Sequence, residues 1–271
     1  MKNIFLIFVS LLIISCSQRI TRPLNNFSSA TEDNKEISAN SYQRISTNDA
    51  NYVQKMEELY PAWDVRLGRF FPKDGNITVE EKRIMLKKLS LIKFMLNTPE
   101  FEERVLSTTM YSAVTAKGPN GNIKVGSKLD SERIMKVLKN RKYNVVIRKS
   151  SIDPRKSAAR GVLGPSIYCS SDNYKLETWW IAFPAAQNWT KGYYPEEPYL
   201  SAVVFHEILH NTGFSHTSDK KYGAIYPLQN IYKSLYNDAK WKEKYKEKLE
   251  DFIYYYEMKY PQVLLEDSKK S

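Results

Sequence analysis

The sequence has little cysteine and histidine and few long apolar runs. Its 271 residues include only two cysteines and three histidines. Two cysteines exclude a multi-disulfide scaffold, a cysteine-based zinc ribbon and an iron–sulfur cluster. The main apolar run covers residues 4–14 and is interrupted only by Ser10. At about 1.5 Å per residue it reaches roughly half of a bilayer core, so it is too short to span a membrane as a helix.

The residues that are present suit a folded, basic protein. Hydrophobic residues make up 42% and charged residues 26% of the chain, which excludes a wholly disordered protein. The formal net charge is +11, which favours anionic partners. The sequence shows no module of interleaved basic and aromatic residues, so we expect no nucleic-acid partner.

The beginning of the chain indicates export. Lys2 precedes the apolar run, as a single charge precedes the hydrophobic region of a signal peptide. The run ends at Ser15-Cys16, which resembles the lipobox of bacterial lipoproteins. The resemblance implies a signal peptide over residues 1–15, a lipid such as palmitate on Cys16 and anchorage to a membrane of the cell envelope, on its periplasmic or surface side. An ordinary signal peptide with a chance cysteine is the alternative.

The remainder divides into two parts. Residues 16–51 are rich in Ser, Asn and Thr, and we expect a flexible tether. Residues 52–271 contain no repeat and no second linker, so they predict one domain, which we expect to be monomeric.

Local patterns in this domain predict an α+β fold. A capping box at Thr78–Glu81 predicts a helix that extends to Asn97, and Thr98-Pro99 predicts the start of another that extends to Leu106. Further helices are predicted at 131–138 and 201–211, strands at 143–148 and 178–183, and mostly loop at 150–172. One apolar stripe predicts a terminal helix packed against the domain: Trp241, Tyr245, Leu249, Phe252 and Tyr256.

All three histidines lie within eleven residues, from His206 to His216. His206 and His210 are four residues apart on a predicted helix, so they share one face, about 6 Å apart along the axis. Two imidazoles at this spacing can bind one zinc ion, and Glu207 can reach a water bound to that metal.

Gly213 follows this helix and can adopt a positive φ. It can therefore end the helix and turn the chain so that His216 becomes a third ligand. Three nitrogen ligands leave a fourth position for water, which is typical of a catalytic zinc site.

The pattern His206-Glu207-x-x-His210-x-x-Gly213-x-x-His216 is similar to the extended zinc motif of the metzincin metallopeptidases. The resemblance implies a zincin-like fold, with a twisted mixed sheet, an active-site helix and a small helical C-terminal subdomain. It also implies one catalytic Zn²⁺ and endopeptidase activity on protein or peptide substrates.

Metzincins also have a methionine-containing turn beneath the zinc. Gly223-Ala224-Ile225-Tyr226-Pro227 stands at a suitable distance and resembles the Ala-Leu-Met-Tyr-Pro turn of matrix-metalloproteinase-like members. The sequence departs from the family here, because Ile225 replaces the methionine. We interpret Ile225 as an equivalent of similar bulk. Tyr226 is a candidate for contact with the transition state, and packing in the core or a loop is the alternative.

The same resemblance suggests a mechanism. Zinc would lower the pKa of its water and polarise the scissile carbonyl, and Glu207 would accept the proton and pass it to the leaving amine. In family members an extended peptide pairs with an edge strand above the active-site helix. Residues 178–183 are our candidate for that edge, and an internal strand is the alternative.

Two alternatives concern the remaining cysteine and the function. Cys169 suggests a thiolate that occupies the fourth zinc position, but the family's motif around such a cysteine is missing, which favours a free buried cysteine. The rival function is a non-catalytic, zinc-containing surface lipoprotein that binds anionic envelope polymers. Glu207 argues against it, because a structural zinc site does not need this carboxylate.

Overall fold

The structure is a computed structural model that describes residues 43–118, 121–164, 167, 177–186, 189 and 198–265. The predicted signal peptide, Cys16, most of the predicted tether and Cys169 lie outside the described residues, so the hypotheses about them stay predictions. Among the described residues, no helix combines the length and the apolar character that crossing a membrane requires.

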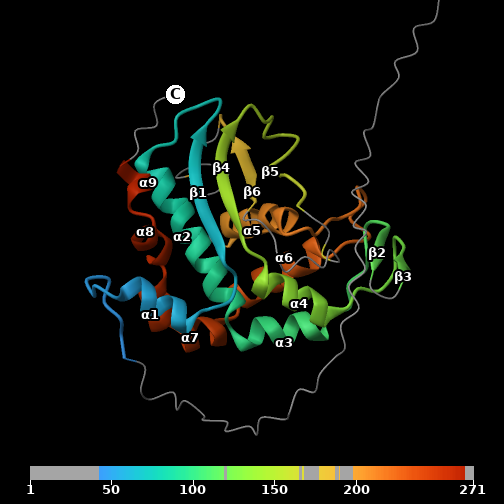
Figure 1. Cartoon of the computed structure of the whole chain (residues 1–271), viewed down its shortest axis with the longest axis horizontal. Helices are drawn as coiled ribbons and strands as arrows, with labels where there is room; N and C mark the ends of the chain where they lie inside the picture. The colour runs from blue at the N-terminus through green and yellow to red at the C-terminus, as the bar shows by residue number, and fades with distance from the viewer. Residues whose placement is uncertain are drawn as a thin grey trace, which may run out of the picture. The chain divides into compact units, whose positions relative to one another are not determined.

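The described chain forms an α+β fold, as the sequence predicts (Figure 1). The strands are β1 (Val65–Pro72), β2 (Ala116–Gly118), β3 (Gly121–Ile123), β4 (Tyr143–Ser150), β5 (Arg160–Gly161) and β6 (Thr178–Pro184). The helices are α1 (Tyr52–Leu59), α2 (Val79–Leu96), α3 (Pro99–Ser107), α4 (Ser131–Asn140), α5 (Tyr199–Asn211), α6 (Ile225–Tyr236), α7 (Ala239–Phe252), α8 (Tyr255–Lys259) and α9 (Gln262–Leu265).

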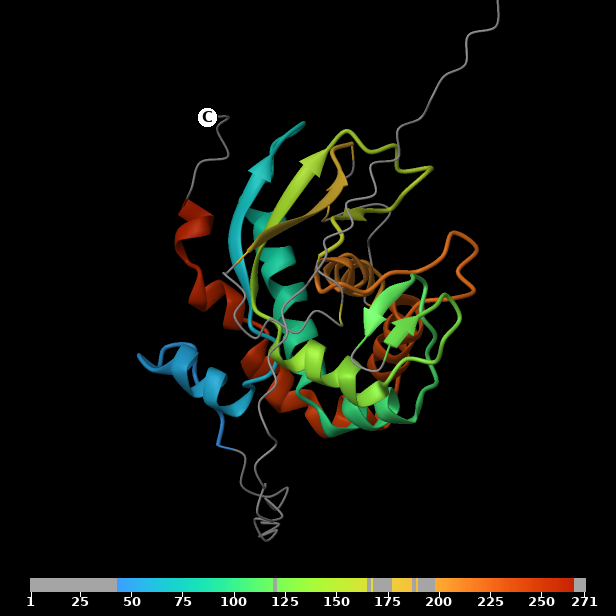
Figure 2. The same cartoon turned by 45° about the vertical axis from the view of Figure 1, so that its right-hand side comes forward.

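The main sheet is mixed and open, with four strands in the order β1-β4-β6-β5. Strand β4 runs parallel to β1 and β6, and β5 runs antiparallel to β6. The buried side chains of Val145, Ile147 and Ile181 belong to the core of the domain. Helix α2 lies behind the sheet in both views, and α5 lies behind the lower part of the sheet in Figure 1 (Figures 1 and 2). The sheet and these helices thus enclose the core, and α5 is held against the end of the sheet formed by β5 and β6.

The prediction that residues 178–183 form an edge strand is wrong. Strand β6 lies between β4 and β5, and β5 is the edge strand. Arg160 pairs with Ala182, and Gly161 pairs with Ile181. A strand of only two residues has no alternating pattern that the sequence could reveal.

Helix α2 confirms the predicted capping box. The Thr78 hydroxyl accepts a hydrogen bond from the Glu81 backbone N–H, and the Glu81 carboxylate accepts one from the Thr78 N–H. The same carboxylate forms a buried ion pair with Lys149 of β4, with 2.7 Å between Nζ and Oε1. Glu81 therefore both begins the helix and joins it to the sheet. Breaking such a buried pair typically costs about 3–5 kcal/mol.

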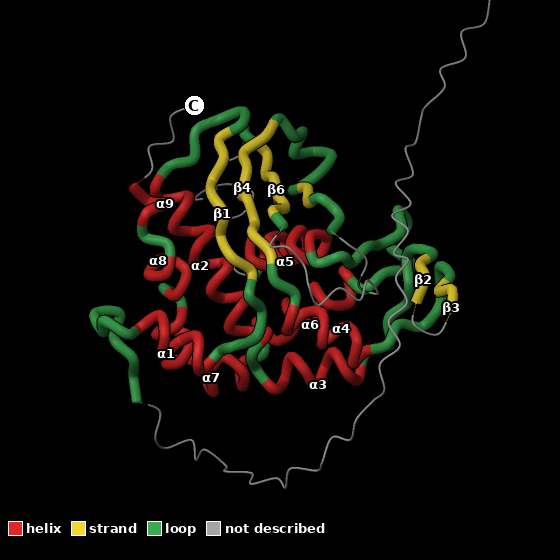
Figure 3. Tube along the Cα trace, viewed as in Figure 1, coloured by secondary structure: helices red, strands yellow, loops and turns green. Residues whose placement is uncertain are grey.

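The predicted terminal helix is broken into two pieces beside α2 (Figure 3). Helix α7 ends at Phe252 and α8 begins at Tyr255. The backbone N–H of Tyr256 donates to the Ser90 hydroxyl of α2 at 3.1 Å, so this tertiary hydrogen bond replaces a helical one. The aromatic stripe still packs as predicted, because the Trp241 and Phe252 rings both contact the Phe94 ring.

Two residues that precede the first helix also contact α7. The Arg44 guanidinium donates to the Asp251 carboxylate at 3.0 Å, and the Ile45 backbone N–H donates to the same carboxylate at 3.1 Å. The end of the segment predicted as a tether therefore packs on the folded part.

Candidate metal centre

Helix α5 presents two of the three histidines on one face. Its other residues are mostly apolar, and Leu200, Val204 and Leu209 are buried in the core. This burial fixes the helix within the domain. His206 and His210 are one turn apart, and their ring centroids are 5.2 Å apart. The helix thus fixes the spacing that the sequence predicts.

A Schellman motif ends α5 and redirects the chain toward the histidines. Gly213 has a φ of +95°, and its N–H donates to the His210 carbonyl at 2.9 Å. The N–H of Phe214 donates to the Leu209 carbonyl at 3.0 Å. This turn brings His216 back, and its ring centroid lies 5.3 Å from that of His206.

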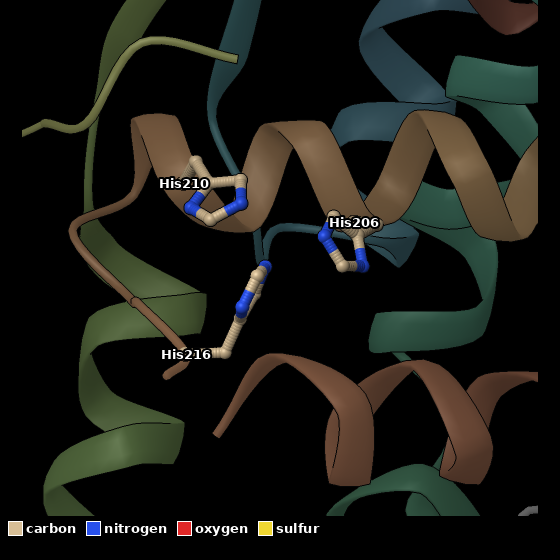
Figure 4. Close-up of side chains that lie close together, drawn as sticks. All are labelled: His206, His210 and His216. Atoms are coloured by element: carbon tan, nitrogen blue, oxygen red, sulfur yellow. The ribbon is translucent and has the colours of Figure 1, made fainter. Parts of the chain in front are cut away.

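The three imidazoles face one another (Figure 4). One ligand atom from each of His206, His210 and His216 can be chosen so that all lie within 4.8 Å of one another. The structure therefore confirms that the residues of the motif form a cluster that could hold a metal ion, as expected for a zinc site of the HExxHxxGxxH type.

A short backbone ladder holds His216 in place. His216 forms a β-bridge with Gly223, and Gly223 forms another with Tyr111, which lies far earlier in the sequence. Gly223 has a φ of +128°, and a Cβ there would lie 2.3 Å from the Ser215 carbonyl oxygen. The position of His216, the third candidate ligand, therefore depends on a glycine at position 223, because any other residue would be strained there.

Helix α6 supplies a hydrogen-bond partner that the sequence does not predict. The Gln229 Oε1 lies 3.2 Å from Nδ1 of His206, and its Nε2 donates to the Ala202 carbonyl at 3.1 Å. Because the amide nitrogen is committed to a carbonyl, the amide oxygen accepts from Nδ1–H of His206. This leaves Nε2 of His206 free of its proton for a metal. Nothing in the sequence around Gln229 indicates this role.

The histidines are electrostatically prepared to bind a cation. Burial lowers the pKa of both His206 and His210 to about 4, and hydrogen bonds to Gln229 and to the Phe214 backbone counteract this in part. Both imidazoles are therefore neutral at physiological pH, which is the form that binds metals. The Nδ1 of His216 lies 3.1 Å from the Thr217 carbonyl oxygen, which sets its tautomer in the same way.

Glu207 lies in a desolvated position under the edge strand. Its exposed fraction is 7%, and burial raises the pKa of its carboxyl to about 8, although a hydrogen bond from the Gly161 backbone opposes this shift. A Cβ on Gly161 would lie 3.1 Å from Oε2 of Glu207 and 2.6 Å from its carbonyl oxygen. The carboxylate is thus held between α5 and β5.

Tyr226 also belongs to the centre. Its ring centroid lies 5.1 Å from that of His206 and 4.8 Å from that of His216. Ile225 is fully buried at the start of α6. The ring that lies against the histidines thus belongs to Tyr226, and the role of Ile225 as a Met-turn equivalent stays a prediction.

The donor set fits zinc. Three neutral imidazole nitrogens suit Zn²⁺ far better than Mg²⁺ or Ca²⁺, which prefer oxygen ligands. When compared with family models, with curated proteins and with solved structures, the chain gives no match. The geometry of this centre is therefore the basis for inferring its function.

Proposed function

We propose that this protein is a zinc-dependent endopeptidase of the metzincin type, exported and tethered to the cell envelope by a lipid on Cys16. The observation that carries the peptidase proposal is the position of Glu207. Its buried carboxylate directly follows a ligand in the sequence and lies beneath an edge strand. A cluster that served only to hold a structural metal would not need a desolvated carboxylate in this place.

The residues of the centre would have two roles, metal binding and proton transfer. His206, His210 and His216 would hold the ion. A zinc ion bound there would act as a Lewis acid, polarising a carbonyl and lowering the pKa of water. Glu207 would accept a proton and return it to the leaving amine. A nearby cation lowers the pKa of a carboxyl group, so Glu207 would ionise more readily in the metal-bound protein.

Strand β5 would align the substrate. Among the described residues its only sheet neighbour is β6, and on its other edge the Gly161 backbone donates a hydrogen bond to Glu207. An extended peptide could add to this edge by backbone hydrogen bonds. Because Gly161 of β5 contacts Glu207, such a peptide would pass close to the carboxylate. The tight packing of β5 on α5 supports this role.

Hydrolysis of a mixed peptide library by the full-length, zinc-supplied protein tests the proposal. We expect cleavage that stops with a chelator and returns with zinc. Glu207→Gln should retain zinc and lose at least about 10²-fold in rate, the usual contribution of a general base. Glu103→Gln, on the exposed side of α3, is the matched control and should cleave normally. If the zinc-bound wild-type protein cleaves nothing, the non-catalytic alternative is favoured.

A further inference from the structure

A short loop after His216 carries a strained lysine. The loop is closed by a hydrogen bond from the Thr217 N–H to the Tyr222 carbonyl at 2.9 Å. Inside it, Lys220 has a φ of +62°, one of two positive φ values among the described residues other than glycine. A lysine in this region of φ is strained, because its Cβ crowds the backbone. Glycine or asparagine would fit the loop better, so the loop alone does not explain a lysine here.

This lysine lies beside the metal centre. Its Nζ lies 5.3 Å from the centroid of the Tyr226 ring. That ring contacts the rings of both His206 and His216. A single aromatic ring therefore connects the ammonium group to two of the three candidate ligands.

Lys220 has no counter-charge of its own in the described part of the chain, because no carboxylate there forms an ion pair with it. The neighbouring Asp219 carboxylate is engaged elsewhere. It accepts hydrogen bonds from the Thr217 hydroxyl at 2.5 Å and from the Lys221 backbone N–H at 3.1 Å. Lys220 is an exposed residue, so its ammonium can bind an anion from outside the chain.

A cation beside a centre that binds a cation is electrostatically unfavourable unless an anion joins them. Strain of the backbone is likewise typical of positions kept for a function. We propose that Lys220 binds a carboxylate of the peptide substrate and so gives the centre a preference for acidic peptides. This inference rests on the proposed function. The carboxylate could come from an Asp or Glu side chain or from a free C-terminus.

Lys221 offers a matched control. It is the adjacent residue and carries the same charge, but its Nζ lies 5.1 Å from the Tyr222 ring instead of the Tyr226 ring. Lys220→Met and Lys221→Met remove the same charge from the same loop. Lys220→Gly removes the side chain and also relieves the strain.

Binding of four peptide pools to the full-length, zinc-supplied protein tests this inference. The pools are random octapeptides with either Asp and Glu or Asn and Gln, each with a free or an amidated C-terminus. Affinity is measured by displacement of a fluorescent peptide. We expect one carboxylate source to bind about tenfold more tightly than its neutral counterpart, as one charged hydrogen bond allows. Comparing the pools that differ in side chains tests the Asp and Glu carboxylates as the source. Comparing the pools that differ at the C-terminus tests the terminal carboxylate.

Lys220→Met and Lys220→Gly should abolish this preference, whereas Lys221→Met should keep it. Lys220→Gly should also unfold at a temperature no lower than the wild-type protein, which separates loss of binding from loss of the fold. Equal affinity of the wild-type protein for all pools, or a preference that survives Lys220→Met, would overturn the inference. Preference without cleavage supports the carboxylate site and contradicts the peptidase proposal, and cleavage without preference does the reverse.

Discussion

At the scale of single residues, burial affects the two kinds of side chain in the centre in opposite ways. Burial keeps His206 and His210 neutral, so protons compete with a metal for these ligands only in acidic solution. The same burial makes Glu207 difficult to ionise, because its charged form loses the solvation of water. The histidines are thus in the form that binds a metal. Without a bound cation, the charged form of Glu207 destabilises the folded state.

This destabilisation predicts that Glu207→Gln stabilises the metal-free protein. Burial raises the folded-state pKa of Glu207 from 4.5 to about 8, so this residue's contribution to stability is present below pH 4.5 and is lost as the pH rises toward 8. Glutamine does not titrate. The difference in free energy of unfolding should therefore grow over this range to about 2–4 kcal/mol. Urea unfolding in chelator at pH 5 and pH 8 measures it, and an equal difference at both values would contradict the prediction.

A second residue-scale prediction concerns Gln229, whose amide oxygen accepts from His206. Gln229→Leu should lower zinc affinity about 10- to 100-fold, the usual effect of losing such a partner of a ligand. Gln229→Glu keeps an acceptor and should bind zinc nearly as well as the wild-type protein. Competition with a zinc indicator gives the affinities. Gln54→Leu, which removes an exposed amide on α1, is the control. Unchanged affinity in Gln229→Leu would rule out the positioning role.

The ligands could be predicted from the sequence because their geometry is local. Four residues of helix and one glycine turn determine how His206, His210 and His216 meet. Gln229 could not be predicted, because it approaches from α6, and only the packing of α6 against α5 places it. Tyr226 is a candidate only through the resemblance to the Met-turn, and the same packing places its ring beside the histidines. Local spacing contains no information about such an approach.

At the scale of elements, the closest contact in the centre is between the edge strand with its following loop and α5. The Asn211 amide of α5 donates to the Val162 carbonyl at 2.7 Å and to the Trp180 carbonyl at 3.2 Å. The N–H of Gly164 donates to the His210 carbonyl at 2.9 Å. These bonds attach α5 to β6 and to the loop after β5, through the Asn211 side chain and through the backbone of Gly164.

This contact predicts that Gly164→Ala is destabilising. A Cβ there would lie 1.9 Å from the Asn211 carbonyl oxygen, so the loop or the helix must move. We expect a loss of about 2 kcal/mol or more in the free energy of unfolding. Gly75→Ala, whose Cβ would find its nearest neighbour at 3.5 Å, should change it by less than about 0.5 kcal/mol. Denaturant unfolding of both variants provides the comparison, and equal stabilities would refute the expected clash.

Helices and strands likewise divide into those that local sequence predicts and those that only distant contacts determine. Helices with a cap and a regular apolar face, such as α2 and α4, match the sequence prediction closely. Strand β5 is set by pairing with β6, and the break before α8 is set by the Ser90 hydroxyl. Such elements depend on contacts with distant segments, so no local pattern predicts them.

At the scale of the whole molecule, metal binding should stabilise the fold, because the ligands come from α5 and from the loop after it. Zinc at about 1,000 times its Kd would add about 4 kcal/mol, which for a protein of this size raises Tm on the order of 10 °C. Differential scanning calorimetry with and without chelator measures the shift. His216→Ala should show a much smaller one, and an equal shift in this variant would exclude His216 as a ligand.

Because of Gly223, mutations outside the three histidines should also abolish zinc binding. This glycine has no donor atom for a metal, yet it pairs with both His216 and Tyr111 and has no space for a Cβ. In a random mutagenesis screen for lost zinc binding, substitutions at position 223 should therefore be recovered together with those of the histidines. A map of such mutations would mark the backbone that supports the third ligand as clearly as the ligand itself.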